Sequence, residues 1–244
     1  MKTSEKQTVG EFVAQDFRTA ALFSKYKIDF CCKGNRTLEE VCEKKGLDAN
    51  AIQNELNAVL DSKSDSAIDF KSWPIDLLID YIEKTHHRYV EEKSIALLFY
   101  LDKLCKVHGE RHPELFEIAL HFKICAGELA QHMKKEELIL FPFVKKLYSA
   151  TKNNTPIEQP LFGTVDNPIA MMQDEHEAEG ERFLKIAALT NDYTPPNDAC
   201  QTYKVTFAML KEFEQDLHKH IHLENNIVFP KAIAMEAQLC LNQM

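Results

Sequence analysis

Apolar positions in the second half of the chain recur at helical spacing around two copies of one segment, His132–Pro142 and His220–Pro230. In each copy a glutamate follows the histidine by four residues, and Phe-Pro closes the segment. Apolar residues three positions before and seven positions after each histidine share its helical face: Leu129 and Ile139 in the first copy, Leu217 and Ile227 in the second. The pattern predicts two helices that each direct an imidazole and a carboxylate into an apolar interior.

The repeat includes two further histidines, His87 and His176, which precede the histidines of the two segments by 45 and 44 residues. From residue 74 onward the chain therefore consists of two helical hairpins, each with a lone-histidine helix followed by a His-x-x-x-Glu helix. This duplication predicts an all-α, pseudo-symmetric four-helix bundle over residues 74–244. Pro142 lies within the pattern and is expected to kink or stop its helix, because proline lacks a backbone N–H.

The first sixty residues show a different pattern, in which short apolar stretches alternate with turn residues. Thr8–Glu11 and Thr37–Glu40 each place a threonine three positions before a glutamate, which is the capping-box signature of a helix start. Asp61–Lys71 is polar and rich in serine and aspartate, as linkers are. We expect a small N-terminal helical domain over residues 1–60 and a linker over residues 61–73.

Composition limits the partners and the compartment. The net charge of −9 argues against nucleic acid or an anionic membrane as the main partner. The N-terminus lacks the apolar core of a signal peptide, and no apolar run approaches the roughly 18 residues that a membrane span needs. Seven cysteines without a regular spacing indicate a reducing compartment, so the expected location is the cytoplasm.

Two of the seven cysteines, Cys31 and Cys32, are adjacent in a predicted turn. They cannot easily pair with each other, because the planar peptide bond between them opposes so small a ring. The basic residues around them, Lys27, Lys33 and Arg36, are expected to lower a thiol pKa and favour the thiolate. The alternative is two small residues at a turn. The other cysteines are expected at core or boundary positions: Cys42, Cys105, Cys125, Cys200 and Cys240.

The two His-x-x-x-Glu helices carry the candidate chemistry. If their apolar faces meet, two imidazoles and two carboxylates gather in one buried place: His132, Glu136, His220 and Glu224. An unpaired buried carboxylate is costly, so the arrangement predicts a metal site, and its symmetry predicts two ions. Nitrogen and oxygen ligands without a thiolate suit iron or manganese, and zinc is a further option. Glu137 faces about a quarter-turn away and is expected to be a solvated charge.

Helical periodicity does not choose between His86 and His87 in the first helix of the bundle, because both lie near apolar faces. The repeat spacing favours His87. The remaining histidines are expected at the surface or in loops: His108, His112, His121, His218 and His222.

The chain links four motifs: an N-terminal DFCC, the lone histidines, HxxxEE-x-x-x-FP and HxxLENN-x-x-FP. Together these motifs resemble the iron-sulfur cluster repair di-iron proteins, the repair-of-iron-centres family. The resemblance implies a small cysteine-bearing domain and a hemerythrin-like four-helix bundle that holds two non-haem irons, bridged by oxo and carboxylate groups. Carried over position by position, it implies four histidine ligands and two bridging carboxylates: His87, His132, His176 and His220, with Glu136 and Glu224.

The same resemblance implies a role in repairing iron-sulfur clusters damaged by oxidants or nitric oxide. The protein would supply or exchange iron, or react with nitric oxide, with Cys31 and Cys32 as redox or relay residues. The implied partners are damaged or apo iron-sulfur proteins, with nitric oxide or dioxygen as small ligands. A second copy of the chain is a further candidate partner.

Three other functions share parts of this pattern. A hemerythrin-type oxygen or nitric oxide carrier needs a fifth histidine, whereas the repeat supplies four in equivalent places. A ferritin-like oxidase uses Glu-x-x-His pairs on two helices, and here the only clean pair, Glu83 and His86, is unrepeated. A nitric oxide reductase or peroxidase would share the same ligands. The sequence therefore leaves open whether the protein is an enzyme.

Overall fold

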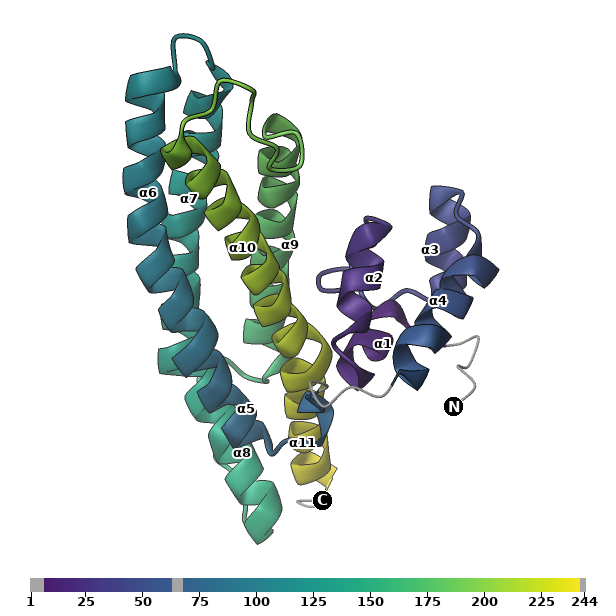
Figure 1. The fold of residues 1–244 in the computed structure, drawn as a ribbon. Coiled ribbons are helices and arrows are strands. Elements are labelled where there is room, and N and C mark those ends of the chain that lie inside the picture. The colour runs from purple at the N-terminus through teal and green to yellow at the C-terminus, as the bar shows by residue number, and fades with distance from the viewer. Residues whose placement is uncertain (1–6, 63–67, 242–244) are drawn as a thin grey trace.

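The computed structural model describes residues 7–62 and 68–241, and within these ranges it is all-α, as the sequence predicts (Figure 1). The only β-pairing in the described ranges is an isolated bridge between Thr8 and Thr37. No helix among the described residues is long and apolar enough to cross a membrane. The chain forms a small N-terminal unit of short helices beside a long bundle (Figure 1).

The N-terminal unit contains four helices: α1 (Val9–Gln15), α2 (Thr19–Lys25), α3 (Leu38–Lys45) and α4 (Ala49–Asp61). Both predicted capping boxes are confirmed. The Glu11 N–H donates to Thr8 Oγ1 at 3.2 Å, and the Thr8 N–H donates to Glu11 Oε2 at 2.8 Å. Thr37 and Glu40 make the same reciprocal pair at the start of α3. These bonds satisfy N–H groups that would otherwise lack partners in the first helical turn.

The bundle begins after a short 3₁₀ turn, and its helices are joined by π-helical turns at three places. The elements are η1 (Phe70–Ser72), α5 (Ile75–Tyr81), α6 (Arg88–His108), α7 (Glu114–Lys135), α8 (Phe141–Asn153), α9 (Asp166–Leu189), α10 (Gln201–Leu223) and α11 (Phe229–Leu241). The π turns are η2 (Ile82–His87), η3 (Glu136–Leu140) and η4 (Glu224–Val228). Helices α6, α7, α9 and α10 contact one another in a ring, and α5, α8 and α11 extend the bundle beyond the π turns.

The π turns change the register that a regular helix would have. In η3 the Phe141 N–H bonds to the Glu136 carbonyl, five residues back, and the chain then continues into α8 with Pro142 in its first turn. The helical path therefore does not stop at Pro142. In this turn Ile139 is 51% exposed and Leu140 is buried, so the prediction that Ile139 shares the buried face is wrong. Ile227 in the second copy is buried as predicted, although η4 is also a π turn, and α1 of the N-terminal unit contacts η4 there.

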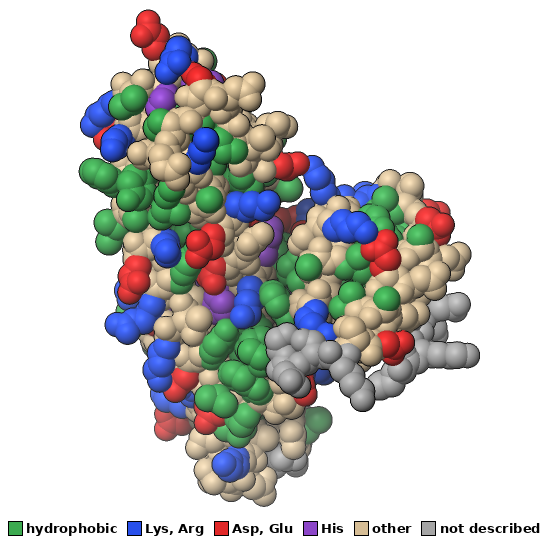
Figure 2. Space-filling model, in the orientation of Figure 1, with side chains coloured by type: hydrophobic (Ala, Val, Ile, Leu, Met, Phe, Trp, Pro, Cys, Tyr) green, Lys and Arg blue, Asp and Glu red, His purple; other side chains and the backbone are tan. Residues whose placement is uncertain are grey.

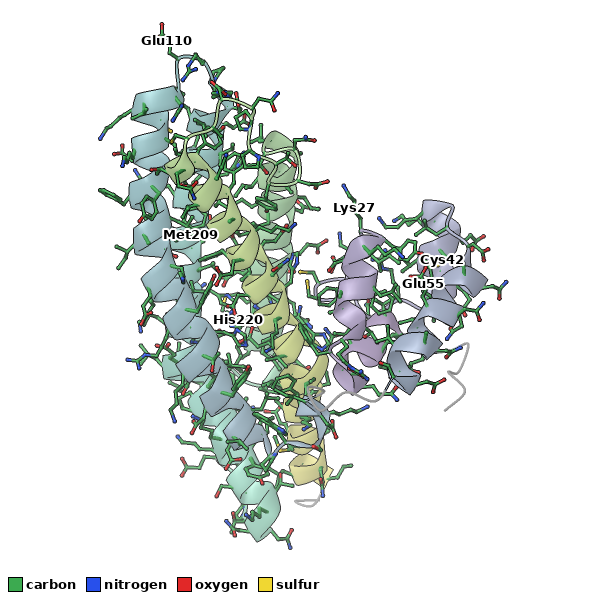
Figure 3. All side chains as sticks on the ribbon, viewed as in Figure 1. Lys27, Cys42, Glu55, Glu110, Met209 and His220 are labelled. Atoms are coloured by element: carbon green, nitrogen blue, oxygen red, sulfur yellow. The ribbon has the colours of Figure 1, made fainter. Side chains whose placement is uncertain are left out.

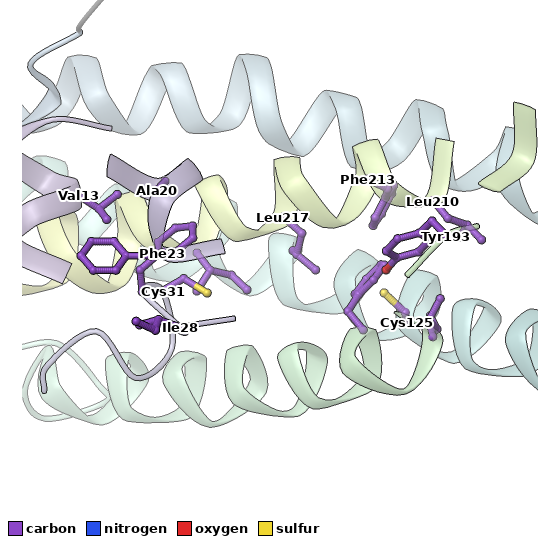
Figure 4. Packing of buried hydrophobic residues seen from close by; sticks show 14 of the residues in the cluster. Val13, Ala20, Phe23, Ile28, Cys31, Cys125, Tyr193, Leu210, Phe213 and Leu217 are labelled. Atoms are coloured by element: carbon purple, nitrogen blue, oxygen red, sulfur yellow. The ribbon is translucent and has the colours of Figure 1, made fainter. Parts of the chain in front are cut away.

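The N-terminal unit packs against the side of the bundle, where α1 contacts α10 and η4 (Figure 2). Phe23, Ile28 and Cys31 belong to the same apolar cluster as Leu217 of α10 (Figure 4). The end of the expected linker is also structured, because Phe70 in η1 is buried; residues 63–67 of that linker lie outside the described residues. The N-terminal unit is therefore packed against the bundle and is not connected to it by the linker alone.

Charged pairs join the two parts at their edges. Lys27 Nζ lies 3.1 Å from Asp192 Oδ2, and Lys33 Nζ lies 2.5 Å from Glu177 Oε1. Lys27 stands at the edge of the N-terminal unit that faces the bundle (Figure 3). These side chains are about half exposed or more, so each pair adds little stability. Each pair joins a lysine of the N-terminal unit to an acidic side chain of the bundle.

Candidate metal centre

The six side chains singled out by the repeat meet in one layer inside the bundle. Each comes from a different element: His87 from η2, His132 from α7, Glu136 from η3, His176 from α9, His220 from α10 and Glu224 from η4. All six are at most 2% exposed. His220 lies midway along the bundle (Figure 3), and two separate apolar clusters lie on the two sides of the layer. The layer is therefore shielded from water on both sides.

The carboxylate of Glu136 lies between two histidines. Its Oε2 is 3.4 Å from His87 Nε2, and its Oε1 is 3.4 Å from His132 Nε2. Neither oxygen has a hydrogen-bond partner among the described residues. Each oxygen therefore faces a different imidazole nitrogen.

The carboxylate of Glu224 is placed in the same way. Its Oε1 is 3.0 Å from His220 Nε2 and 4.0 Å from His87 Nε2, and its Oε2 is 3.3 Å from His176 Nε2. The two glutamates thus divide the layer into two groups. One contains His87 and His220, the other contains His132 and His176, and both contain the two glutamates.

The donor atoms of each group are spaced for a metal ion. Within a group they all lie within 4.8 Å of one another. Ligand distances of about 2.0–2.2 Å put opposite ligands of one ion roughly 4–4.4 Å apart. Buried carboxylate oxygens without hydrogen-bond partners would be very costly in an apolar interior unless a cation compensates them. The residues present therefore fit a metal centre.

Proton binding partly compensates these charges when metal is absent. Burial opposes protonation of His87 and His132, but Glu136, together with Glu224 and other nearby carboxylates, outweighs it and raises their pKa values to about 8 and about 9. Burial dominates at His220 and lowers its pKa. Burial would also raise the pKa of Glu224, but the neighbouring imidazoles hold it well below its usual value. The site is therefore a set of carboxylates partly neutralised by imidazolium.

Three of the four histidines have an acceptor at Nδ1, which leaves Nε2 free to bind a metal. His87 Nδ1 is 3.0 Å from Glu137 Oε1, and His132 Nδ1 is 2.8 Å from Glu175 Oε2. His176 Nδ1 is 3.0 Å from Asn225 Oδ1. Such acceptors fix the tautomer and the ring orientation of a ligand histidine. His220 Nδ1 has no partner among the described residues.

Glu137 corrects one of our predictions. Its side chain is only 23% exposed, and it bonds to both His87 and Lys134 instead of being a solvated charge. Sequence reasoning also missed Glu175 and Asn225. Glu137 and Asn225 each follow a glutamate of the site directly, so the repeat itself was the signal that could have identified them.

The Phe-Pro ends of the two segments have a structural role that the sequence did not reveal. Phe141 stacks on His87 with ring centroids 5.8 Å apart, and Phe229 stacks on His176 at 6.1 Å. Each phenylalanine thus holds the lone histidine of its own half of the repeat. The contact limits the rotation of these two rings.

Two further histidines, His108 and His222, are buried, so their prediction as surface or loop residues is wrong. His222 is covered by Phe17 and Phe30 of the N-terminal unit, which a pattern within the bundle cannot foresee. His108 is covered by the loop before α10, where its Nε2 is 3.3 Å from Cys200 Sγ. It lies two residues from Glu110, at the far end of the bundle from His220 (Figure 3).

The cysteine pair lies beside the backbone of His176. Cys32 Sγ donates to the His176 carbonyl at 3.4 Å, and neither cysteine belongs to the two His-Glu groups. The expected thiolate is not favoured at Cys31, because the Cys32 thiol and burial raise its pKa well above the usual value. The basic flanks fail to lower it, since Lys27 and Lys33 bind acidic residues of the bundle instead.

His86 is as buried as His87 but points elsewhere. Its Nδ1 is 2.9 Å from Asp216 Oδ1, and its ring stacks on His220 at 5.8 Å.

We expect His87→Ala to lose at least half of the bound metal, because Nε2 of His87 faces both glutamates. His86→Ala should retain nearly all of it. Metal analysis of the two purified variants measures this, and the opposite ranking would move the ligand by one residue.

Comparison with known proteins follows the same division of the chain. Residues 5–60 match the family described as "Domain of Unknown function (DUF542)", and residues 78–232 match the "Hemerythrin HHE cation binding domain". Proteins named iron-sulfur cluster repair protein YtfE are similar over almost the entire chain. The one from Musicola paradisiaca is 33% identical, covering 95% of this chain and 98% of the relative. Those from Yersinia pestis and an Enterobacter species are 34% and 35% identical, with 94% and 98% covered. The chain belongs to this iron-sulfur cluster repair family, with a hemerythrin-type cation-binding domain.

Proposed function

We propose that the chain is a di-iron protein that helps to repair iron-sulfur clusters damaged by oxidants or nitric oxide. One observation carries the di-iron part: both buried glutamates present oxygens to two separate histidine pairs. This is the placement that carboxylates bridging two ions need. The repair part rests on the relatives, which are named for it.

In this proposal His87 and His220 would hold one iron, His132 and His176 would hold the other, and Glu136 and Glu224 would each offer carboxylate oxygens to both. Bound irons would supply redox chemistry, affinity for diatomic ligands and a store of exchangeable iron. The protein's own residues keep the site dry and hold the imidazoles by their Nδ1 atoms. The partners are damaged or apo iron-sulfur proteins, with nitric oxide or dioxygen as small ligands.

The domain division supports the same proposal. Residues 1–60 would form the cysteine-bearing domain, residues 61–73 the connection and residues 74–244 the di-iron bundle. The ranges that match the two family models lie within the first and third of these parts.

The stoichiometry of bound iron tests the di-iron centre. We expect about two irons per chain after anaerobic reconstitution, because the ligand set occurs as two groups that share both carboxylates. Iron analysis gives the count, and Mössbauer spectroscopy at low temperature tells whether the two irons are magnetically coupled. A single uncoupled iron, or tightly held zinc alone, would contradict the proposal.

Cys31 and Cys32 are proposed as a relay or docking point for the acceptor rather than as iron ligands. Their loop contacts the backbone of a proposed ligand, and Cys32 is partly exposed. We expect the double variant Cys31→Ser/Cys32→Ser to keep its iron content and its spectrum. Cluster recovery in a damaged iron-sulfur enzyme should nevertheless be several times slower.

The recovery assay is informative only if the variant is intact. Its melting temperature and iron content are therefore compared with those of the wild type first. Cys240→Ser, which changes an exposed cysteine on α11, is the matched control and should leave recovery unchanged. Recovery at the wild-type rate in the double variant would assign both cysteines a purely structural role.

A further inference from the structure

Asn225 joins the cysteine loop to the metal centre through its two amide atoms. Its Oδ1 lies 3.0 Å from His176 Nδ1, and its Nδ2 donates to the Cys31 carbonyl at 3.2 Å. A second contact joins the same loop to His176, because Cys32 Sγ donates to the His176 carbonyl at 3.4 Å. The loop of the N-terminal unit therefore touches both the backbone and, through one amide, the ring of the same histidine.

The chemistry of the amide fixes its orientation. A histidine that binds metal through Nε2 carries its proton on Nδ1, so it needs an acceptor there. A backbone carbonyl needs a donor. Only an amide with its oxygen toward His176 and its nitrogen toward Cys31 serves both, because the flipped amide would place two acceptors against each other.

The other half of the repeat shows what the amide adds. There the equivalent residue is Glu137, which accepts from His87 Nδ1 at 3.0 Å and is bonded to Lys134 on the bundle itself. A carboxylate has no donor, so it can orient a ligand but cannot hold a carbonyl. The next residue in that half, Leu138, is 73% exposed, whereas its counterpart Asn226 lies under the N-terminal unit.

Asn226 contributes to docking without touching the site. Its Nδ2 lies 3.3 Å from the carbonyls of Phe30 and Cys31 and 3.2 Å from His222 Nδ1. Gly10 leaves room for it, since a Cβ at residue 10 would lie 2.2 Å from Asn226 Oδ1. Both asparagines therefore bind the loop of the N-terminal unit, but only Asn225 also contacts a histidine of the metal site.

From this geometry we infer that Asn225 is a positioning residue that couples the seating of the Cys31–Cys32 loop to metal binding at His176. The inference rests on the proposed function in one respect, namely that His176 is a metal ligand. Coupling between two sites is reciprocal. If the seated loop stabilises the ligating orientation of His176, bound metal must stabilise the seated loop by the same factor.

Alkylation of Cys32 reports the state of the loop without any assay of repair. The intact protein is treated anaerobically with iodoacetamide, with and without bound Fe²⁺, and the Cys32 peptide is quantified by mass spectrometry over time. In the wild type we expect iron to slow alkylation of Cys32 by about fivefold or more, the lower end of usual coupling factors.

The two asparagines supply the test variant and its control. Asn225→Asp keeps an acceptor for His176 but loses the donor to Cys31, so the protein should retain iron while the ratio of the two alkylation rates falls to about one. Asn226→Ser loosens the loop in both states, so both rates should rise while the ratio stays near that of the wild type. If Asn225→Asp fails to fold, Asn225→Ala takes its place, and the ratio of its two alkylation rates must likewise fall to about one.

The outcomes separate the coupling from the di-iron proposal. A wild type that retains iron but shows no protection of Cys32 overturns the coupling alone. Protection that persists in Asn225→Asp also overturns it, because iron would then be acting directly on the thiols, for which Asp29 with the two cysteines is a candidate group. A wild type that retains no iron overturns the proposed metal centre, and the coupling with it.

Discussion

Glu136→Gln is expected to reduce iron binding from about two ions per chain to fewer than one. Glutamine has nearly the same size as glutamate, so the packing of the dry layer is preserved. Its amide has only one carbonyl oxygen and no charge, and it cannot present an oxygen both to the His87 side and to the His132 side. Both proposed ions share this carboxylate, so its loss should affect both.

Three companion variants make this result specific. Glu224→Gln should behave like Glu136→Gln, because Glu224 also belongs to both groups. Glu137→Ala should weaken iron binding by roughly 10- to 100-fold, the usual effect of removing a partner of a ligand histidine. Glu117→Gln on the exposed side of α7 should have no effect. Iron content and chelator competition rank the four, and equal iron content in all of them would contradict the bridging assignment.

The repeat was sufficient to locate all six side chains that the structure brings together. His132 and His220 were found because their spacing to a glutamate and to Phe-Pro is duplicated, and a duplicated pattern fixes which helical faces meet. The same spacing preferred His87 over His86, in agreement with where Nε2 of His87 points. The capping boxes were local signals and needed no tertiary information.

Periodicity failed where the helices depart from α geometry. It assumed a regular turn after Glu136, where the chain has a π turn, and it assigned Glu137 to solvent and Ile139 to the core. Ile227 lies in the matching π turn and is nevertheless buried, where the N-terminal unit contacts η4. The π turn also explains how a helix continues past Pro142. No helical pattern signals such a turn in advance, although its position at the ligand residues is typical of functional sites.

Contacts between the two parts of the chain were also beyond the sequence pattern. His222 is covered by Phe30 of the N-terminal unit, and Asn225 has its second partner, the Cys31 carbonyl, in that unit. The basic residues around the cysteines were assigned to the thiols because they are near in sequence. In the structure Lys33 reaches Glu177, and the Cys31 thiol keeps a raised pKa.

Iron affinity is expected to rise steeply between pH 6 and pH 8 and to level off above about pH 9. In the metal-free protein, burial opposes protonation, but Glu136 and the other nearby carboxylates raise the pKa of His87 to about 8 and that of His132 to about 9. Both imidazoles therefore hold protons near neutral pH, and a metal must displace them to bind. As the pH falls below these values, the cost of displacement grows. It disappears once the pH exceeds both.

The size of the effect follows from the number of displaced protons. Each costs roughly tenfold in affinity per pH unit below its pKa, so one or two protons give about 10- to 100-fold per unit. His220 adds nothing, because burial lowers its pKa and keeps it neutral. Anaerobic Fe²⁺ titrations against a chelator of known protonation constants at pH 6, 7 and 8 give the slope, and proton release in weakly buffered solution gives an independent count. An affinity that does not change over this range would mean that His87 and His132 are already neutral in the metal-free protein, and that the charges of the two buried glutamates are compensated in another way.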